Sequence, residues 1–76
     1  MNISIKARLL TDTLTAEYEL PDGASAGQAI DLLACGHPEA GELTNILIMV
    51  NGRRAGLSTE LSDGDRLDVI QILGGG

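Results

Sequence analysis

Apolar and polar residues alternate along the first twenty positions of the chain. Residues 3–9 are apolar at every second position, and residues 14–20 repeat the alternation after the polar break "TDT". A strand places successive side chains on opposite faces, so each run predicts a strand with one buried face. Because only the short break separates them, the two strands are expected to pair as an antiparallel hairpin.

A helix is predicted after the turn-forming stretch "PDGAS". Ser25 and Gln28 have the spacing of a capping box, in which each side chain satisfies a free backbone amide of the first turn. The following apolar residues have the spacing of one buried helix face: Ala26, Ala29, Ile30 and Leu33. Gln28 and Asp31 are expected to point outward. The helix should end at Gly36, which suits a left-handed cap, before Pro38.

The second half of the chain predicts three strands joined by turns. Residues 46–50, "ILIMV", are continuously apolar, which is typical of a central strand covered on both faces. Asn51 and Gly52 form a strong tight-turn signal. Residues 53–61 are irregular, with one short strand, and "SDGD" predicts a turn before a final strand at residues 66–73.

The final strand is apolar on both faces near its end. Leu67 and Val69 lie on one face, and Ile70 and Ile72 lie on the other. The order of elements favours an α+β fold, a mixed sheet of four to five strands with one main helix on one face. Two interpretations of the strand stay open. Either Ile70 and Ile72 are exposed as a protein interface on the uncovered face, or the strand is buried on both sides.

Length and composition limit what the chain can be. Its 76 residues suffice for one domain, whose core must be aliphatic because Tyr18 is the only aromatic residue. No apolar run is long enough to span a membrane and the first residues lack the features of a signal peptide, so we expect a cytoplasmic protein. The net charge of −6 argues against nucleic acid or anionic lipid as partners and favours an electropositive protein.

Cys35 and His37 are the candidates for metal or nucleophilic chemistry. A zinc site needs three or four ligands at matched spacing, and a catalytic Cys–His pair needs a third, orienting group. The chain has one cysteine and one histidine. We therefore interpret Cys35 as a small residue at a helix end beside a solvent-exposed histidine, and predict neither a metal site nor an internal disulfide.

The charged clusters are also interpreted as structural. Asp63, Asp65 and Asp68 lack the order of a calcium loop and suit turn chemistry and a solvated strand edge. Arg53 and Arg54 follow a turn, where arginines more often form a solvated tip than an anion site. The chain also lacks a phosphate-binding loop and a paired-carboxylate motif, so it is predicted to have no active site of its own.

The chemistry is expected instead at the C-terminus, where three glycines follow the last strand. A terminal carboxylate is ionised at neutral pH and is a poor electrophile, so it must first gain a leaving group. Adenylation with ATP on another enzyme would supply that group. Glycines suit a tail that enters a narrow nucleotide site, because they have no side chain to obstruct it.

Three stretches and their order resemble a known family. They are Val50-Asn51-Gly52 after an apolar strand, the run from Leu61 to Asp65 before the last strand, and the terminal glycines. With these stretches the chain resembles the ThiS/MoaD family of ubiquitin-like sulfur carriers. The resemblance covers nearly the whole chain and implies a β-grasp domain over residues 1–73, followed by a flexible glycine tail at residues 74–76.

The resemblance also implies what the tail does. In that family a partner adenylates the terminal glycine, and sulfur from a persulfide converts it to a thiocarboxylate that donates sulfur. Carried over, Gly76 bears the thiocarboxylate, and Gly74 and Gly75 form its flexible lead. The chain is then a protein cosubstrate and not an enzyme, with no bound cofactor, because the ATP is used by the partner.

The partners implied by the resemblance are proteins. The chain would dock on an E1-like adenylyltransferase of the ThiF/MoeB type through the apolar residues of its last strand, namely Ile70, Ile72 and Leu73. A persulfide donor would supply the sulfur. The acceptor would be a synthase, either thiazole synthase or the large subunit of molybdopterin synthase.

The pathway and two other functions stay open. The ending "VIQILGGG" is similar to the thiazole carriers, whereas the long N-terminal hairpin is more similar to the molybdopterin carriers. Carriers for the tungsten cofactor (tungstopterin), for cysteine or for tRNA thiolation also stay open. Alternatively, the chain is a β-grasp interaction module that binds through its open sheet face and has a passive tail. A third possibility is a protein modifier that is conjugated to lysines through the same activated terminus.

Overall fold

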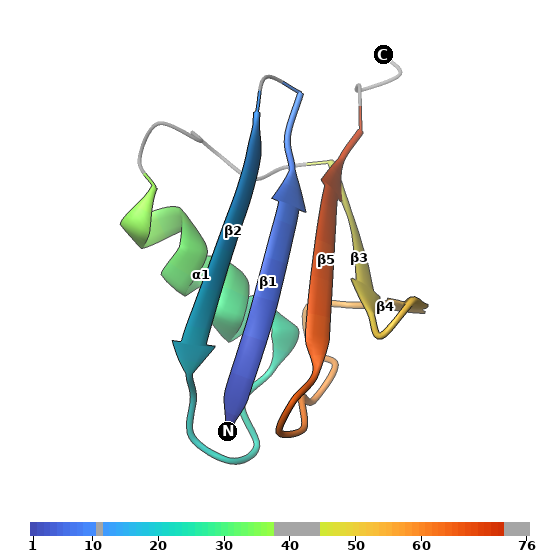
Figure 1. Cartoon of the computed structure of the whole chain (residues 1–76). Helices are drawn as coiled ribbons and strands as arrows, with labels where there is room; N and C mark the ends of the chain where they lie inside the picture. Colours follow the sequence, from blue (N-terminus) through green and yellow to red (C-terminus); the bar gives the residue numbers. More distant parts are fainter. Residues whose placement is uncertain (11, 38–44, 73–76) are drawn as a thin grey trace.

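Five strands and one helix make up the computed structural model, which describes residues 1–10, 12–37 and 45–72 (Figure 1). In chain order the elements are β1 (Asn2–Arg8), β2 (Thr13–Glu19), α1 (Ala26–Gly36), β3 (Ile46–Val50), β4 (Arg53–Ala55) and β5 (Arg66–Gln71). The strands form a sheet in the order β2-β1-β5-β3-β4, and α1 lies across one face of it (Figure 1). This arrangement confirms the predicted mixed sheet with one helix.

The last strand, β5, lies at the centre of the sheet. β1 pairs with β2 as the predicted antiparallel hairpin, with Ile5 opposite Ala16. On its other side β1 pairs in parallel with β5, where Ile5 is opposite Leu67. β5 then pairs antiparallel with β3, with Leu67 opposite Val50. The first strand of the chain, β1, is therefore the direct neighbour of the last strand, β5, inside the sheet.

The core lies between α1 and the face of the sheet that α1 covers. The helix contributes the four residues predicted from its spacing: Ala26, Ala29, Ile30 and Leu33. The two central strands contribute alternate residues, none more than 2% exposed: Ile3, Ile5, Ala7, Leu67 and Val69. Burying a large aliphatic side chain stabilises the fold by about 1.5–3 kcal/mol, so these residues hold the helix on the sheet.

The start of α1 has the predicted capping box and one contact that the sequence did not predict. Ser25 Oγ accepts from the Gln28 N–H at 3.4 Å, and Gln28 Oε1 accepts from the Ser25 N–H at 2.8 Å. The Gly27 N–H donates to the Leu57 carbonyl at 2.8 Å. A Cβ at Gly27 would lie 3.0 Å from that carbonyl oxygen, so a glycine lets the segment after β4 approach the helix closely.

The end of α1 differs from the predicted end. Gly36 is the last helical residue and its φ is not positive, and His37 is the cap, with φ of −135°. The prediction of a left-handed glycine cap was therefore wrong. The His37 N–H donates to the Ala34 carbonyl at 3.4 Å, so a tightened last turn satisfies that carbonyl without a left-handed residue. His37 is half-buried, whereas we predicted it to be solvent-exposed.

Asn51 and Gly52 form the predicted tight turn between β3 and β4, with φ of 52° and 82°. The Asn51 side chain also fixes the start of β5. Its Oδ1 accepts from the Arg66 N–H at 2.9 Å, and its Nδ2 donates to Asp65 Oδ1 at 2.8 Å. Asp65 Oδ2 in turn accepts from the Ser62 N–H at 2.7 Å, which confirms the predicted turn role of this aspartate.

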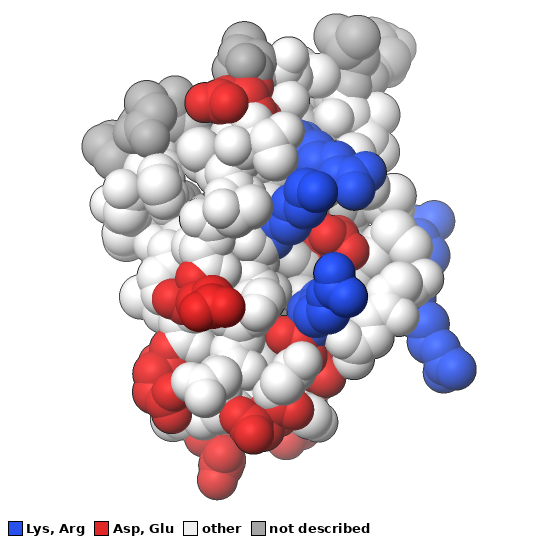
Figure 2. Space-filling view, viewed as in Figure 1, with Lys and Arg blue, Asp and Glu red and all other residues white. Residues whose placement is uncertain are grey.

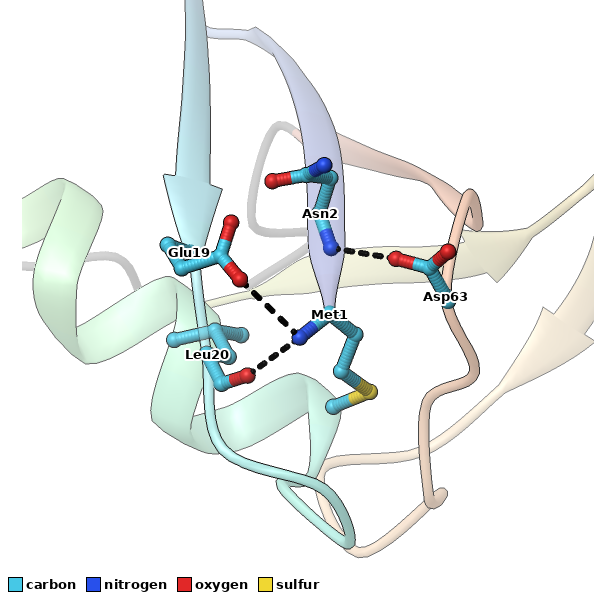
Figure 3. A network of polar contacts seen from close by, with 5 residues as sticks. All are labelled: Met1, Asn2, Glu19, Leu20 and Asp63. Carbon is cyan, nitrogen blue, oxygen red and sulfur yellow. Dashed lines mark hydrogen bonds and ion pairs between the residues drawn. The ribbon is translucent and has the colours of Figure 1, made fainter.

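Polar contacts fix the beginning of β1 to two other parts of the chain (Figure 3). The Met1 amino group donates to the Leu20 carbonyl at 2.7 Å and pairs with Glu19 at 3.4 Å. The Asn2 N–H donates to Asp63 Oδ1 at 2.7 Å. The end of β2 and the turn before β5 are thereby held on either side of β1, at the end of the sheet away from the last residues of β5 (Figure 1).

β3 is not covered on both faces, contrary to the prediction. Ile48 is buried against the core, but Leu47 and Met49 point to the opposite face and are only half-buried. The reason is the number of layers. α1 covers one face of the sheet, and within the described residues no second element lies over the other face, which we call the open face (Figure 1).

Candidate functional site

The C-terminal strand carries the chain to one end of the sheet. β5 ends at Gln71, beside the end of β1 that leads into the β1–β2 hairpin (Figure 1). The predicted thiocarboxylate residue Gly76, its lead Gly74 and Gly75, and the predicted docking residue Leu73 lie outside the described residues. Among the described residues, the candidate site therefore consists of those that lead to the tail and of the sheet face beside them.

The last described residues are held from both sides. The Ile72 N–H donates to the Asn45 carbonyl at 2.8 Å, which continues the pairing of β5 with β3 by one residue. On the other side, Gln71 Oε1 accepts from the Leu10 N–H at 3.1 Å. The chain is thus fixed up to Ile72, which is 50% exposed; Leu10, whose N–H bonds to Gln71, is 55% exposed.

The open face has an apolar patch next to this end of β5. The apolar patch consists of Leu47, Met49 and Ile70, all half-buried, with Ile70 directly opposite Leu47. The strand alternation correctly separated Ile70 from the buried Leu67 and Val69. The strand is not buried on both sides: β5 is central but is covered on one face only, with Ile70 half-buried on the open face and Ile72 50% exposed. That these residues form a protein interface stays a prediction.

Leu47 and Met49 were not predicted as surface residues, although both are only half-buried. Their run, "ILIMV", has no alternation, so periodicity alone assigned both faces to the core. The usable signal was the count of helices. With one helix predicted for one face, the second apolar face of this strand had to be open, as Ile70 is on β5.

Most of the basic residues lie on the open face. By strand alternation and register, four of the five in the chain occupy open-face positions, and all four are exposed: Lys6, Arg8, Arg54 and Arg66. Figure 2 shows blue side chains over the middle of this face and at the β4 edge, with red side chains gathered toward β2 and the lower end. A basic surface was not predicted from the sequence, because these residues are far apart along the chain.

Metal-binding clusters and buried polar side chains are both absent from the described residues. Cys35 is exposed, and no group of three or more His, Cys, Asp or Glu residues in the described ranges is placed to hold a metal ion. No polar or charged side chain is buried in these ranges, so none has a desolvated environment that would tune it for catalysis. The one helix described is too short and too polar to cross a membrane.

One family profile matches nearly the whole chain. The profile of the ThiS family matches residues 5–76, which include the terminal glycines, part of β1 and the whole of the other four strands. A search of curated proteins gives no significant match to the chain.

Solved structures of similar shape include a small modifier protein and subunit 1 of molybdopterin-converting factor. Small archaeal modifier protein 1 of H. volcanii is 20% identical, with a TM-score of 0.76 over 95% of this chain and 98% of that protein. A Pyrococcus furiosus protein assigned as molybdopterin converting factor subunit 1 is 25% identical, with a TM-score of 0.74 over the same shares. In a Helicobacter pylori complex of subunits 1 and 2 of molybdopterin-converting factor, the matched chain is 19% identical, with a TM-score of 0.69 and full coverage of both chains. The fold is the ubiquitin-like β-grasp.

Proposed function

The chain belongs to the ThiS family, and from this membership we propose that it is a sulfur carrier protein whose terminal Gly76 becomes a thiocarboxylate. Small ubiquitin-fold proteins of the ThiS/MoaD kind are non-catalytic carriers. One observation carries the proposal: the family match extends through the glycines, in a chain whose described residues hold no metal-binding cluster and no buried polar side chain.

The proposed chemistry takes place on partners. A carboxylate oxygen of Gly76 attacks the α-phosphorus of ATP on an E1-like adenylyltransferase, and pyrophosphate leaves. The terminal sulfur of a persulfide then attacks the acyl carbon and displaces AMP, which forms an acyl disulfide. A second thiol attacks the donor's sulfur in that disulfide and breaks the S–S bond. The donor is released as a disulfide with that thiol, and the thiocarboxylate stays on Gly76.

In the proposed function, this chain presents its C-terminal tail to the partner enzymes. Hydrogen bonds hold Gln71 and Ile72, the residues that precede the tail, in a fixed position relative to the open face. A partner bound to the open face therefore always has the start of the tail at the same position. We assign docking to Ile70, Ile72 and Leu73. Ile70 is half-buried on the open face and Ile72 is half exposed, so both can lose further solvent contact on binding, which supports this assignment.

The sulfur acceptor in the proposal is a synthase. The similarity to subunit 1 in the H. pylori complex with subunit 2 supports an acceptor of the molybdopterin synthase type. The ThiS family match supports thiazole synthase equally. The acceptor must carry an electrophilic substrate, because the thiocarboxylate sulfur attacks it as the nucleophile. Water then hydrolyses the bond between that sulfur and the acyl carbon of Gly76, which leaves the sulfur on the substrate and restores the terminal carboxylate.

The test is the intact mass of the protein isolated from its own cells, with fragmentation and a thiol alkylator. We expect an exchange of oxygen for sulfur at Gly76 that reacts with the alkylator. Fragmentation is needed because oxidation of Met1 or Met49 gives nearly the same mass gain. A chain that ends at Gly74 is the matched control and should stay unmodified.

Other outcomes would replace the proposal. Isopeptide-linked adducts between Gly76 and lysines of other proteins would assign the chain as a modifier. A terminus that stays unmodified with the adenylyltransferase, ATP and a persulfide supplied would assign it as a binding module. In that case the chain ending at Gly74 would keep its full affinity for the partner.

A further inference from the structure

Charge is distributed unevenly over this acidic protein. The chain has a net charge of −6, yet the open face of its four strands β1, β5, β3 and β4 is basic. The basic collar consists of Lys6, Arg8, Arg54 and Arg66. Among the open-face positions of these four strands, Asp68 is the single acidic residue, and it is half-buried. Figure 2 shows this division, with acidic side chains gathered toward β2 and the lower end of the molecule.

The basic collar borders the apolar patch on its β1 side, on its β4 side next to Met49, and toward the start of β5. One row across the sheet reads Arg8, Ile70 and Leu47. The next row reads Lys6, Asp68, Met49 and Arg54. Side chains that are opposite on neighbouring strands lie about 4.5–5.5 Å apart at Cβ, so each apolar side chain has a cation within one or two strands of it.

The four cations are not used by the fold. Within the described residues none of their side chains makes a hydrogen bond or an ion pair, and the one salt bridge there joins Met1 to Glu19. Their charges are exposed to solvent and available to a partner. An apolar centre with a charged, hydrated rim is the composition of a protein interface.

We propose that the open face binds an acidic surface with an apolar centre on the adenylyltransferase, the basic collar pairing with acidic residues around that centre. The inference rests on the proposed function for the identity of the partner. A second copy of this chain is disfavoured as the occupant, because it would present the same cations to one another. The net charge suggested an electropositive partner, but the charge at the face beside the tail selects the opposite sign.

The collar also orients the encounter. Its positive face would turn toward an acidic partner while the acidic remainder of the molecule turns away, so the open face approaches first. Such steering acts mainly on the association rate and is screened over a Debye length of about 10 Å at 0.1 M salt.

Neighbouring arginines on β4 supply the test and its control. Arg54 lies opposite Met49 on the open face, whereas Arg53 lies opposite Val50 and alternates to the other side. Both arginines are exposed. Arg54→Glu and Arg53→Glu therefore change the net charge equally at two solvent-exposed positions and differ only in the face of the sheet. The association rate of the full chain is measured with the purified adenylyltransferase of the same organism at several salt concentrations, with circular dichroism to check folding and ATP–pyrophosphate exchange to check activation.

We expect Arg54→Glu to slow association about fivefold at low salt and Arg53→Glu less than about twofold, with the difference lost near 1 M salt. The double variant Lys6→Glu/Arg8→Glu should slow it further. Equal effects of the two β4 variants, or none, would overturn the proposal, as would a dimer of this chain that Arg54→Glu dissociates. If either variant fails to fold, Arg54→Gln and Arg53→Gln provide the same comparison with half the charge change.

The exchange assay separates this inference from the proposed function. Normal exchange with no difference between the β4 variants leaves the carrier function standing and removes the acidic docking surface. Position-dependent binding without exchange supports the docking surface and removes the carrier function. Absence of any binding removes both.

Discussion

The two faces of the same sheet have opposite uses, and β5 shows the contrast between adjacent residues. Leu67 and Val69 are 1% and 0% exposed beneath α1. Asp68 and Ile70, each one position further along, are half-buried on the open face. A single strand therefore holds the fold together with one set of side chains and offers the other set to a partner. Stability and binding are separable in this protein because the period of a strand is two.

Leu67→Ala tests the covered face and should have the largest effect on stability. Leu67 is buried between β1 and β3 under α1, so truncation leaves a cavity in a small core. We expect a loss of about 2–5 kcal/mol in the free energy of unfolding, measured by urea denaturation. A loss below about 1 kcal/mol would mean that the covered face does not carry the stability of the fold.

Asn51→Ala tests the register that assigns residues to the two faces. It removes the hydrogen bonds to Arg66 and Asp65 and places alanine at a φ of 52°, so we expect a loss of about 1–2 kcal/mol. Asn51→Gly is the control, because it loses the same hydrogen bonds but tolerates the positive φ. If both variants are as stable as the wild type, the side chain does not fix the start of β5.

Ile70→Ala tests the open face. Because Ile70 is only half-buried in the free protein, whereas Leu67 is fully buried, we expect its truncation to cost less, about 1 kcal/mol of the free energy of unfolding. The same truncation should cause a much larger fractional loss of binding to the adenylyltransferase than of stability, with binding measured by calorimetry. A stability loss equal to that of Leu67→Ala, or unchanged binding, would erase the contrast between the faces.

Glu19→Gln tests an open-face position on the edge strand β2, away from the apolar patch, and should have the smallest effect. The Glu19 carboxylate pairs with the Met1 amino group at 3.4 Å, but its side chain is 74% exposed (Figure 3). Exposed ion pairs are screened, so we expect about 0.5 kcal/mol or less at low salt, and nothing measurable at high salt. Binding to the partner should not change, and a change would extend the docking surface to the far end of the sheet.

The elements with local causes were predictable from the sequence. The hairpin followed from the alternation of residues 3–9 and 14–20, and the helix start from Ser25 and Gln28. The end of α1 was the local exception. A left-handed glycine and a tightened last turn both satisfy the terminal carbonyls, and the sequence around Gly36 did not distinguish between them.

The candidate site was predicted only in part. Ile70 and Ile72 were identified, but their exposure was open until the structure placed a single helix on one side of the sheet. Leu47 and Met49 were assigned to the core, since an unbroken apolar run contains no information on which face is covered. The glycines of the tail were predicted as the reactive end, and that assignment stays a prediction.

The sequence by itself determined the strands and the helix, the aliphatic core and the glycine terminus, because each depends on residues close together in the chain. Only the tertiary structure decided that β5 lies between β1 and β3, which sets Arg8 and Ile70 side by side although they are far apart in sequence. Local periodicity fixes which side chains of a strand share a face, but not which strands are neighbours. That choice follows from burying the apolar face of α1 on one continuous sheet, and it gathers the basic collar beside the apolar patch.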